Sequence, residues 1–141
     1  MTLKTMRNGM ALGVIAVLTI AAAQAQSETL SVTVPFDYSA GGKVLPAGEY
    51  KVQTGIANGV ILLRNLDQGA TAMMFGNPVE SNKPSQEAKL VFHRYGDSYF
   101  LSEIWASPGT ARSISLRPSR AEREQIAKLG APTTVGLTAS R

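Results

Sequence analysis

The stretch KLVFHRYGDSYFLSEIW, residues 89–105, decides the fold because it predicts two long strands joined by a tight turn. Gly96 followed by Asp97 suits a two-residue type II′ turn, with glycine at the first central position. A turn of this kind fixes the pairing register, so we expect His93 to face Phe100. The stretch holds the only histidine of the chain, so it has to be considered as a site as well as a hairpin.

The predicted register divides the side chains of this hairpin between two faces, because directly opposed residues share a face. The face that we expect to be the core face carries Ala88, Leu90, Phe92, Tyr99, Leu101 and Trp105. The second face carries Val91, His93, Tyr95, Phe100 and Ile104. In this register Leu90 faces Glu103. Since both faces are rich in apolar groups, the second face needs a cover, and a C-terminal helix is a candidate.

Short strands with turns between them are predicted on both sides of the hairpin. Period-2 alternation and turn residues place them near 30–36, 49–55, 60–65, 71–76 and 111–117. Pro35 cannot donate to a ladder, so the first strand is expected to be an edge or to end there. Residues 77–86 are polar, contain two prolines and predict an exposed loop. The fold class is therefore all-β, an antiparallel sandwich or partly closed barrel of about seven strands.

One segment switches to a helical pattern, PSRAEREQIAKLG at residues 118–130, and predicts a surface helix over 119–129. Ser119 is a candidate N-cap and Glu122 completes a capping box. Gly130 ends the helix, and Pro132 prevents its continuation. Residues 131–141 are predicted to be a disordered tail. The basic residues around the helix are interpreted as a solvated face with balanced charge pairs rather than as a site for an anionic envelope polymer.

The first 25 residues predict a secretory signal peptide. Lys4 and Arg7 precede the uncharged run MALGVIAVLTIAAA, and Ala23-Gln24-Ala25 forms a small-x-small cleavage site. The run is shorter than the roughly 20 apolar residues of a membrane span. We therefore expect an exported protein, periplasmic or extracellular, without a transmembrane span after cleavage. Its single β domain would cover residues 26–130.

Composition excludes several classes of function. The chain has no cysteine, which rules out thiolate zinc sites and cysteine nucleophiles. Loss of Lys4 and Arg7 with the signal leaves 12 basic and 10 acidic side chains. The basic residues and the aromatic residues lie in different parts of the chain, which argues against a nucleic-acid partner.

His93 is the one candidate for chemistry in the hairpin. A catalytic histidine needs an orienting partner and a group to activate, and Asp97, Ser98 and Ser102 are close to it in sequence. Strand geometry, however, places Asp97 at the tip of the turn and Ser102 some way along the partner strand. The hydrolase alternative pairs His93 with Asp97 or Glu103. A packed structural histidine is the favoured interpretation, so no catalytic residue is assigned. No metal site is expected, because Glu122 and Glu124 face apart on the helix. No cofactor motif is present, and the pair Met73-Met74 is interpreted as core filling.

Four motifs, taken together, resemble a family of small exported proteins of environmental bacteria. They are VPFDY at 34–38, LPAGEY at 45–50, FHRYGDSYFLSEIW at 92–105 and RPSRAEREQIA at 117–127. The family pattern is V-P-F-x-F, then L-P-A-G-x-Y, then H-x-Y-G-x-x-Y-F-L-x-x-x-W, and then a closing helix. The resemblance implies an exported β domain, and it implies no activity and no catalytic residues.

The sequence thus favours a non-enzymatic exported module with a binding or structural role, whose partner is an envelope component or a protein. Three alternatives remain. The first is a small β-barrel that carries an apolar ligand, and the second is a hydrolase that uses His93. The third is self-assembly through the edge strand that contains Pro35.

Overall fold

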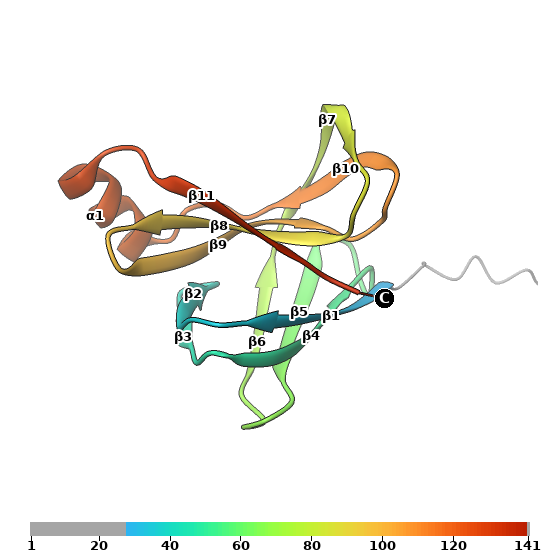
Figure 1. Ribbon diagram of the computed structural model, residues 1–141, viewed down its shortest axis with the longest axis horizontal. Coiled ribbons are helices and arrows are strands. Elements are labelled where there is room, and N and C mark those ends of the chain that lie inside the picture. Colours follow the sequence, from blue (N-terminus) through green and yellow to red (C-terminus); the bar gives the residue numbers. More distant parts are fainter. Residues whose placement is uncertain (1–27, 141) are drawn as a thin grey trace, which may run out of the picture.

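Two β-sheets packed as a sandwich make up most of the computed structural model, which describes residues 28–140 (Figure 1). The first sheet has the strand order β1 (Glu28–Val34), β4 (Gly48–Thr54), β5 (Val60–Asn65) and β6 (Thr71–Phe75). The second has the order β11 (Thr133–Thr138), β8 (Lys89–Tyr95), β9 (Ser98–Trp105), β10 (Thr110–Ser115) and β7 (Asn77–Ser85). The small hairpin of β2 (Tyr38–Ala40) and β3 (Lys43–Leu45) joins the second sheet beside β9. The predicted all-β class is confirmed, whereas the predicted signal peptide at 1–25 lies outside the described residues.

The core lies between the two sheets, and alternation along the strands supplies it. In β1, for example, Leu30, Val32 and Val34 are buried, whereas Ser31 and Thr33 are not. The rings of Tyr38, Tyr50 and Phe92 fill the centre, and each is at most 1% exposed. Tyr38 makes edge contacts with the other two at centroid distances of 5.4 and 5.2 Å. The sandwich is therefore packed with side chains and does not close into a barrel.

Two connections tie the sheets together at opposite sides. Strand β6 continues through Gly76 directly into β7, so the chain passes from one sheet to the other without a loop. A Cβ atom at Gly76 would lie 2.4 Å from Cγ2 of Ile114, which explains why glycine stands at this crossing. At the other side Ser31 and Ser140 exchange two backbone hydrogen bonds of 2.7 and 2.8 Å. Ser140 thus pairs with the middle of the outer edge of β1. Strand β1 ends at Val34, just before Pro35.

The predicted hairpin register is correct near the turn and wrong farther away. His93 opposes Phe100 and Phe92 opposes Leu101, as expected. A bulge at Ser102 then shifts the register, so that Leu90 opposes Ile104 and not Glu103. A bulge inserts one unpaired residue and so exchanges the faces of everything beyond it.

Because of this bulge, Ile104 and Trp105 exchange places relative to the prediction. Ile104 is fully buried in the core. Trp105 lies on the second face, where its Nε1 donates to Glu103 at 3.0 Å and the Lys89 ammonium lies 5.5 Å from its ring. The charge of Glu103 thus stays out of the core.

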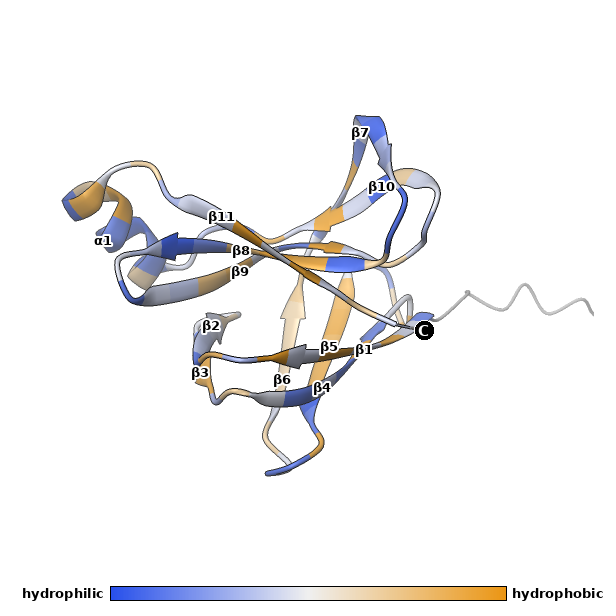
Figure 2. Cartoon of the chain, in the orientation of Figure 1, coloured by the Kyte–Doolittle hydropathy of each residue, from blue (hydrophilic) through white to orange (hydrophobic). Residues whose placement is uncertain are grey.

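Four of the eleven strands in the described residues were not predicted: β2, β3, β7 and β11. The predicted tail at 131–141 is wrong over β11, which pairs with β8 from Thr133 to Thr138. The predicted loop at 77–86 is exposed, but it forms β7 and pairs with β10. Proline is tolerated in β7 because this strand is the edge of its sheet. Figure 2 shows the hydrophilic tip of β7, well away from the hydrophobic strand β5.

The helix is found where the sequence places it. Helix α1 (Arg120–Leu129) begins after Ser119, whose Oγ accepts the N–H of Glu122 at 3.2 Å, and it ends at Gly130. The expected pair of Arg120 and Glu124 is present at 3.6 Å. Within the described residues, no helix is long and apolar enough to cross a membrane.

Candidate functional site

A cluster of four polar side chains joins the second face of the hairpin to helix α1. His93 Nδ1 lies 3.1 Å from Glu122 Oε2, and His93 Nε2 lies 3.2 Å from Ser102 Oγ. Tyr95 donates its hydroxyl to the same Glu122 oxygen at 2.9 Å. We call His93, Tyr95, Ser102 and Glu122 the polar cluster.

Each member owes its place to a local feature of the chain. His93 and Tyr95 are two residues apart on β8 and so share a face. Ser102, in the bulge of β9, lies two residues beyond Phe100, which pairs with His93. The N-cap at Ser119 starts α1, and the first turn of the helix then directs Glu122 toward the sheet.

The contacts assign the protons within the polar cluster. A carboxylate only accepts hydrogen bonds, so the His93 Nδ1–H donates to Glu122. In the neutral imidazole Nε2 is then an acceptor for the hydroxyl of Ser102. Burial raises the pKa of Tyr95 to about 12, and the hydrogen bond to Glu122 and its charge add to the rise. Tyr95 therefore stays protonated and donates to Glu122 well above neutral pH.

The structure brings together a different set from the one considered in the sequence. Glu122 contacts His93, whereas Asp97 lies at the turn and Glu103 accepts from Trp105. From the sequence, Glu122 was interpreted as a capping residue and was not predicted to be the one buried residue of α1. Ser102 was set aside because it was expected to lie some way along the partner strand, whereas its hydroxyl lies 3.2 Å from His93 Nε2. No cluster of three or more metal-binding side chains occurs among residues 28–140.

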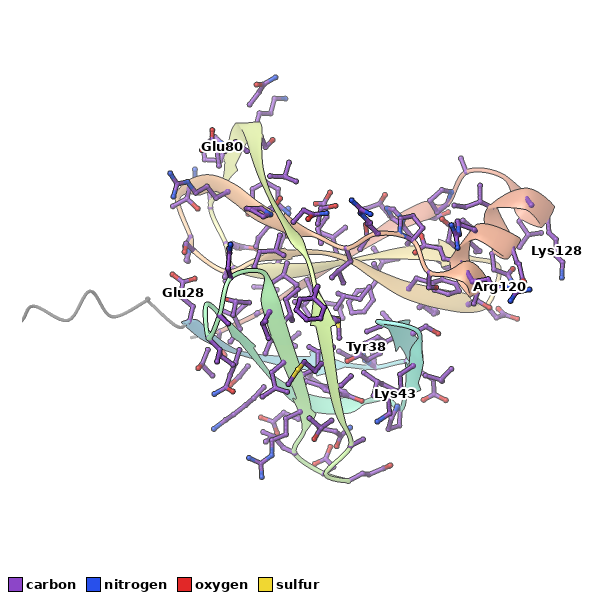
Figure 3. All side chains as sticks on the ribbon, turned by 180° about the vertical axis from the view of Figure 1, so that it is seen from behind. Glu28, Tyr38, Lys43, Glu80, Arg120 and Lys128 are labelled. Carbon is purple, nitrogen blue, oxygen red and sulfur yellow. The ribbon has the colours of Figure 1, made fainter. Side chains whose placement is uncertain are left out.

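A second candidate site is a groove of about 440 Å³ beside the outer edge of β6. Strand β10 follows β7 as far as the pair of Ser115 and Asn77. Leu116 then donates its N–H to Ser102 on β9, so the chain leaves this edge. The groove lies where β10 and β7 separate, and both Phe75 and Arg117 line it. Figure 3 shows the long β6–β7 strand and, beside it, the hairpin that carries Tyr38 and Lys43.

Backbone groups of β6 point into this groove. The carbonyl of Ala70 accepts the N–H of Asn65, and the N–H of Gly76 donates to the carbonyl of Gly59. The backbone groups of the even-numbered residues of β6 therefore point toward β5. Peptide groups alternate in direction along an antiparallel strand, so the backbone N–H and C=O groups of Thr71, Met73 and Phe75 point away from β5. The only described strand that pairs with β6 is β5. The carbonyl of Thr71 instead accepts from Lys43 Nζ at 2.8 Å.

The side chains of Met73 and Phe75, on the face of β6 away from the core, are apolar and exposed. Phe75 is 74% and Met73 is 65% exposed. The interpretation of Met73-Met74 as core filling is thus correct for Met74, which is buried, and wrong for Met73. Neighbouring residues of a strand lie on opposite faces, so only one of the two can reach the core.

The comparisons with known proteins add no relative. No family model matches the chain, and no curated protein or solved structure is significantly similar to it.

Proposed function

We propose that this protein is an exported, non-enzymatic β module that binds an extended segment of another protein along the outer edge of β6. The observation that carries the proposal is the row of outward peptide groups at Met73 and Phe75, next to a groove of about 440 Å³. An unpaired edge is a template for a further strand, with backbone hydrogen bonds for affinity and side-chain pockets for specificity.

The chemistry of the edge fits an extended apolar peptide. Exposed edge strands usually carry charged residues or prolines that prevent pairing, whereas β6 presents Met73 and Phe75. Exposed aromatic side chains of this kind are common anchors in interfaces. Arg117, which also lines the groove, favours an acidic group in the bound segment.

The other binding alternatives have less physical support. A carrier of an apolar ligand needs an enclosed chamber, but the rings of Tyr38, Tyr50 and Phe92 fill the space between the sheets. Self-assembly through β1 would have to displace Ser140, which already pairs with Ser31. At the edge of β6, Lys43 bonds to the carbonyl of Thr71 and Gly41 packs against Met74, so a further strand would add at the end of β6 that carries Phe75.

The proposal is tested by selecting binders from a random linear-peptide display library and measuring their affinity. We expect selected peptides to bind the wild-type protein and to protect the amides of Met73 and Phe75 from hydrogen exchange. Phe75→Lys should weaken binding by about tenfold or more, since burying a lysine in place of an aromatic anchor costs at least about 1.4 kcal/mol.

Val79→Lys is the matched control, because Val79 is an exposed apolar residue of β7 that does not line this groove. It should leave the affinity unchanged. Selected peptides that protect other amides, or that bind Phe75→Lys as tightly as the wild type, would refute the proposal.

A further inference from the structure

The polar cluster has a feature that a strand-binding edge does not use: a serine hydroxyl is hydrogen-bonded to a histidine that a carboxylate orients. Ser102 Oγ lies 3.2 Å from His93 Nε2, and His93 Nδ1 lies 3.1 Å from Glu122. We propose that Ser102 is an activated nucleophile that accepts one acyl group from an activated carboxylic ester.

The order of the three groups is the one that activates a serine. Glu122 accepts from Nδ1–H and so leaves the lone pair on Nε2, the atom that meets the Ser102 hydroxyl. Tyr95 donates to Glu122 at 2.9 Å, and the N-cap at Ser119 holds the turn that carries it. Glu122 is thus a positioning residue, and His93 is the base.

Exposure indicates how an ester reaches this site. The side chain of His93 is 30% exposed, whereas that of Glu122 is 5% exposed. Ser102 is 7% exposed and lies next to the imidazole. The His93 side chain is therefore the part of the polar cluster that an ester meets from solvent, and the orienting carboxylate stays shielded from water.

The reaction balances without a further reagent. The Ser102 oxygen attacks the ester carbonyl carbon while its proton moves to His93 Nε2. The bond between the carbonyl carbon and the alkoxy oxygen breaks, and the proton on Nε2 leaves with the alcohol. The product is an acyl-serine and a neutral imidazole. Each chain has one Ser102, so acylation at this residue ends at one acyl group per chain.

The test uses p-nitrophenyl acetate with the purified protein. We expect release of about one equivalent of p-nitrophenolate per chain, followed by a halt, and peptide mapping that places the acetyl group on Ser102. Ser102→Ala should remove the release, while Ser98→Ala on the same strand should keep it. His93→Ala should lose at least about a hundredfold in labelling rate and regain part of it when imidazole is added.

The role of Glu122 is tested by a double-mutant cycle. Glu122→Gln should slow labelling in the wild-type background and have no further effect on rate in the His93→Ala background, because a positioning residue acts only through the base. Glu124→Gln is the control and should label at the wild-type rate.

Mapping in the wild-type protein decides the proposal even if a variant fails to fold. Absence of acetyl-Ser102, or labelling at Ser102 that is as fast in a folded His93→Ala variant without imidazole, overturns it. Continued release beyond one equivalent would overturn the single-acyl end point and, with it, the non-enzymatic character of the module. Glu122 also lines the groove at β6, so peptide binding is measured separately and on the wild-type protein.

Discussion

At the scale of single residues, Glu122 attaches helix α1 to the sheet. It is the one buried residue of the helix, and its contacts are His93 and Tyr95 rather than apolar side chains. A buried charge that loses its partners is costly, so the helix and the polar cluster depend on each other.

We expect Glu122→Gln to lower the free energy of unfolding by about 1–3 kcal/mol, because the hydrogen bonds to a buried charged group are weakened. Glu124→Gln, at an exposed position of the same helix, should change it by less than about 0.5 kcal/mol. Urea unfolding of both variants checks this. Equal stability of the two variants would mean that α1 does not depend on the polar cluster.

The raised pKa of Tyr95 makes the free energy of unfolding depend on pH in the alkaline range. Its pKa is raised from 10.0 to about 12 in the folded protein, so the folded state retains the proton longer than the unfolded state. This contribution is fully present below about pH 10 and is lost as pH rises toward 12. Urea unfolding between pH 9 and about 12 should therefore show a decline that is smaller in Tyr95→Phe. Parallel curves for the two proteins would contradict the assignment.

Gly76 is required by close packing rather than by its backbone angles. An added methyl group would meet Cγ2 of Ile114 at 2.4 Å and Cδ1 of Ile61 at 3.0 Å. Gly76→Ala should cost about 1–3 kcal/mol of unfolding free energy by overpacking. Gly136→Ala is the control, because nothing lies within 4 Å of a Cβ built there. Thermal unfolding that ranks Gly136→Ala as the less stable variant would contradict this explanation.

At the scale of elements, β11 stabilises the sandwich although the sequence predicts a tail there. It pairs with β8 over six residues, Val135 and Leu137 pack against the core, and Ser140 then bridges to Ser31. A chain that ends at Gly130 would expose the edges of both β8 and β1. We expect this truncation to remove several kcal/mol from a total stability of about 5–15 kcal/mol. A truncated chain with the wild-type urea midpoint would show that β11 is dispensable.

How much of the hairpin and helix could be predicted depends on how local their determinants are. The turn at Gly96 fixes the pairs as far as Phe92, and Ser119 with Gly130 fixes both ends of α1. The bulge at Ser102 depends on packing between distant strands, so no local pattern marks it. For the same reason the contact of Glu122 with His93, 29 residues away, was not predicted.

Strands β7 and β11 were missed for different physical reasons. The prolines of β7 argue for a loop, and they are tolerated only because β7 is an edge. In β11 just two apolar residues, Val135 and Leu137, alternate with polar ones. Two positions are too few to distinguish a strand from a tail at the end of a chain.

At the scale of the whole molecule, the fold class followed from the sequence because alternation, turns and helix caps all agree. The export of the module remains a prediction. It is tested by the intact mass of protein recovered outside the cytoplasm, which should correspond to a chain that begins at Gln26. A mass that includes Lys4 and Arg7 would contradict cleavage after Ala25.

The proposed function depends most directly on whether the outer edge of β6 is open in solution. Amide hydrogen exchange resolved by residue with NMR measures this on the free protein. We expect alternation along β6, with slow exchange at Ala72 and Met74, which bond to β5, and fast exchange at Met73 and Phe75. Slow exchange at all four amides in a dilute monomer would mean that this edge is already covered, and it would contradict the strand-binding proposal.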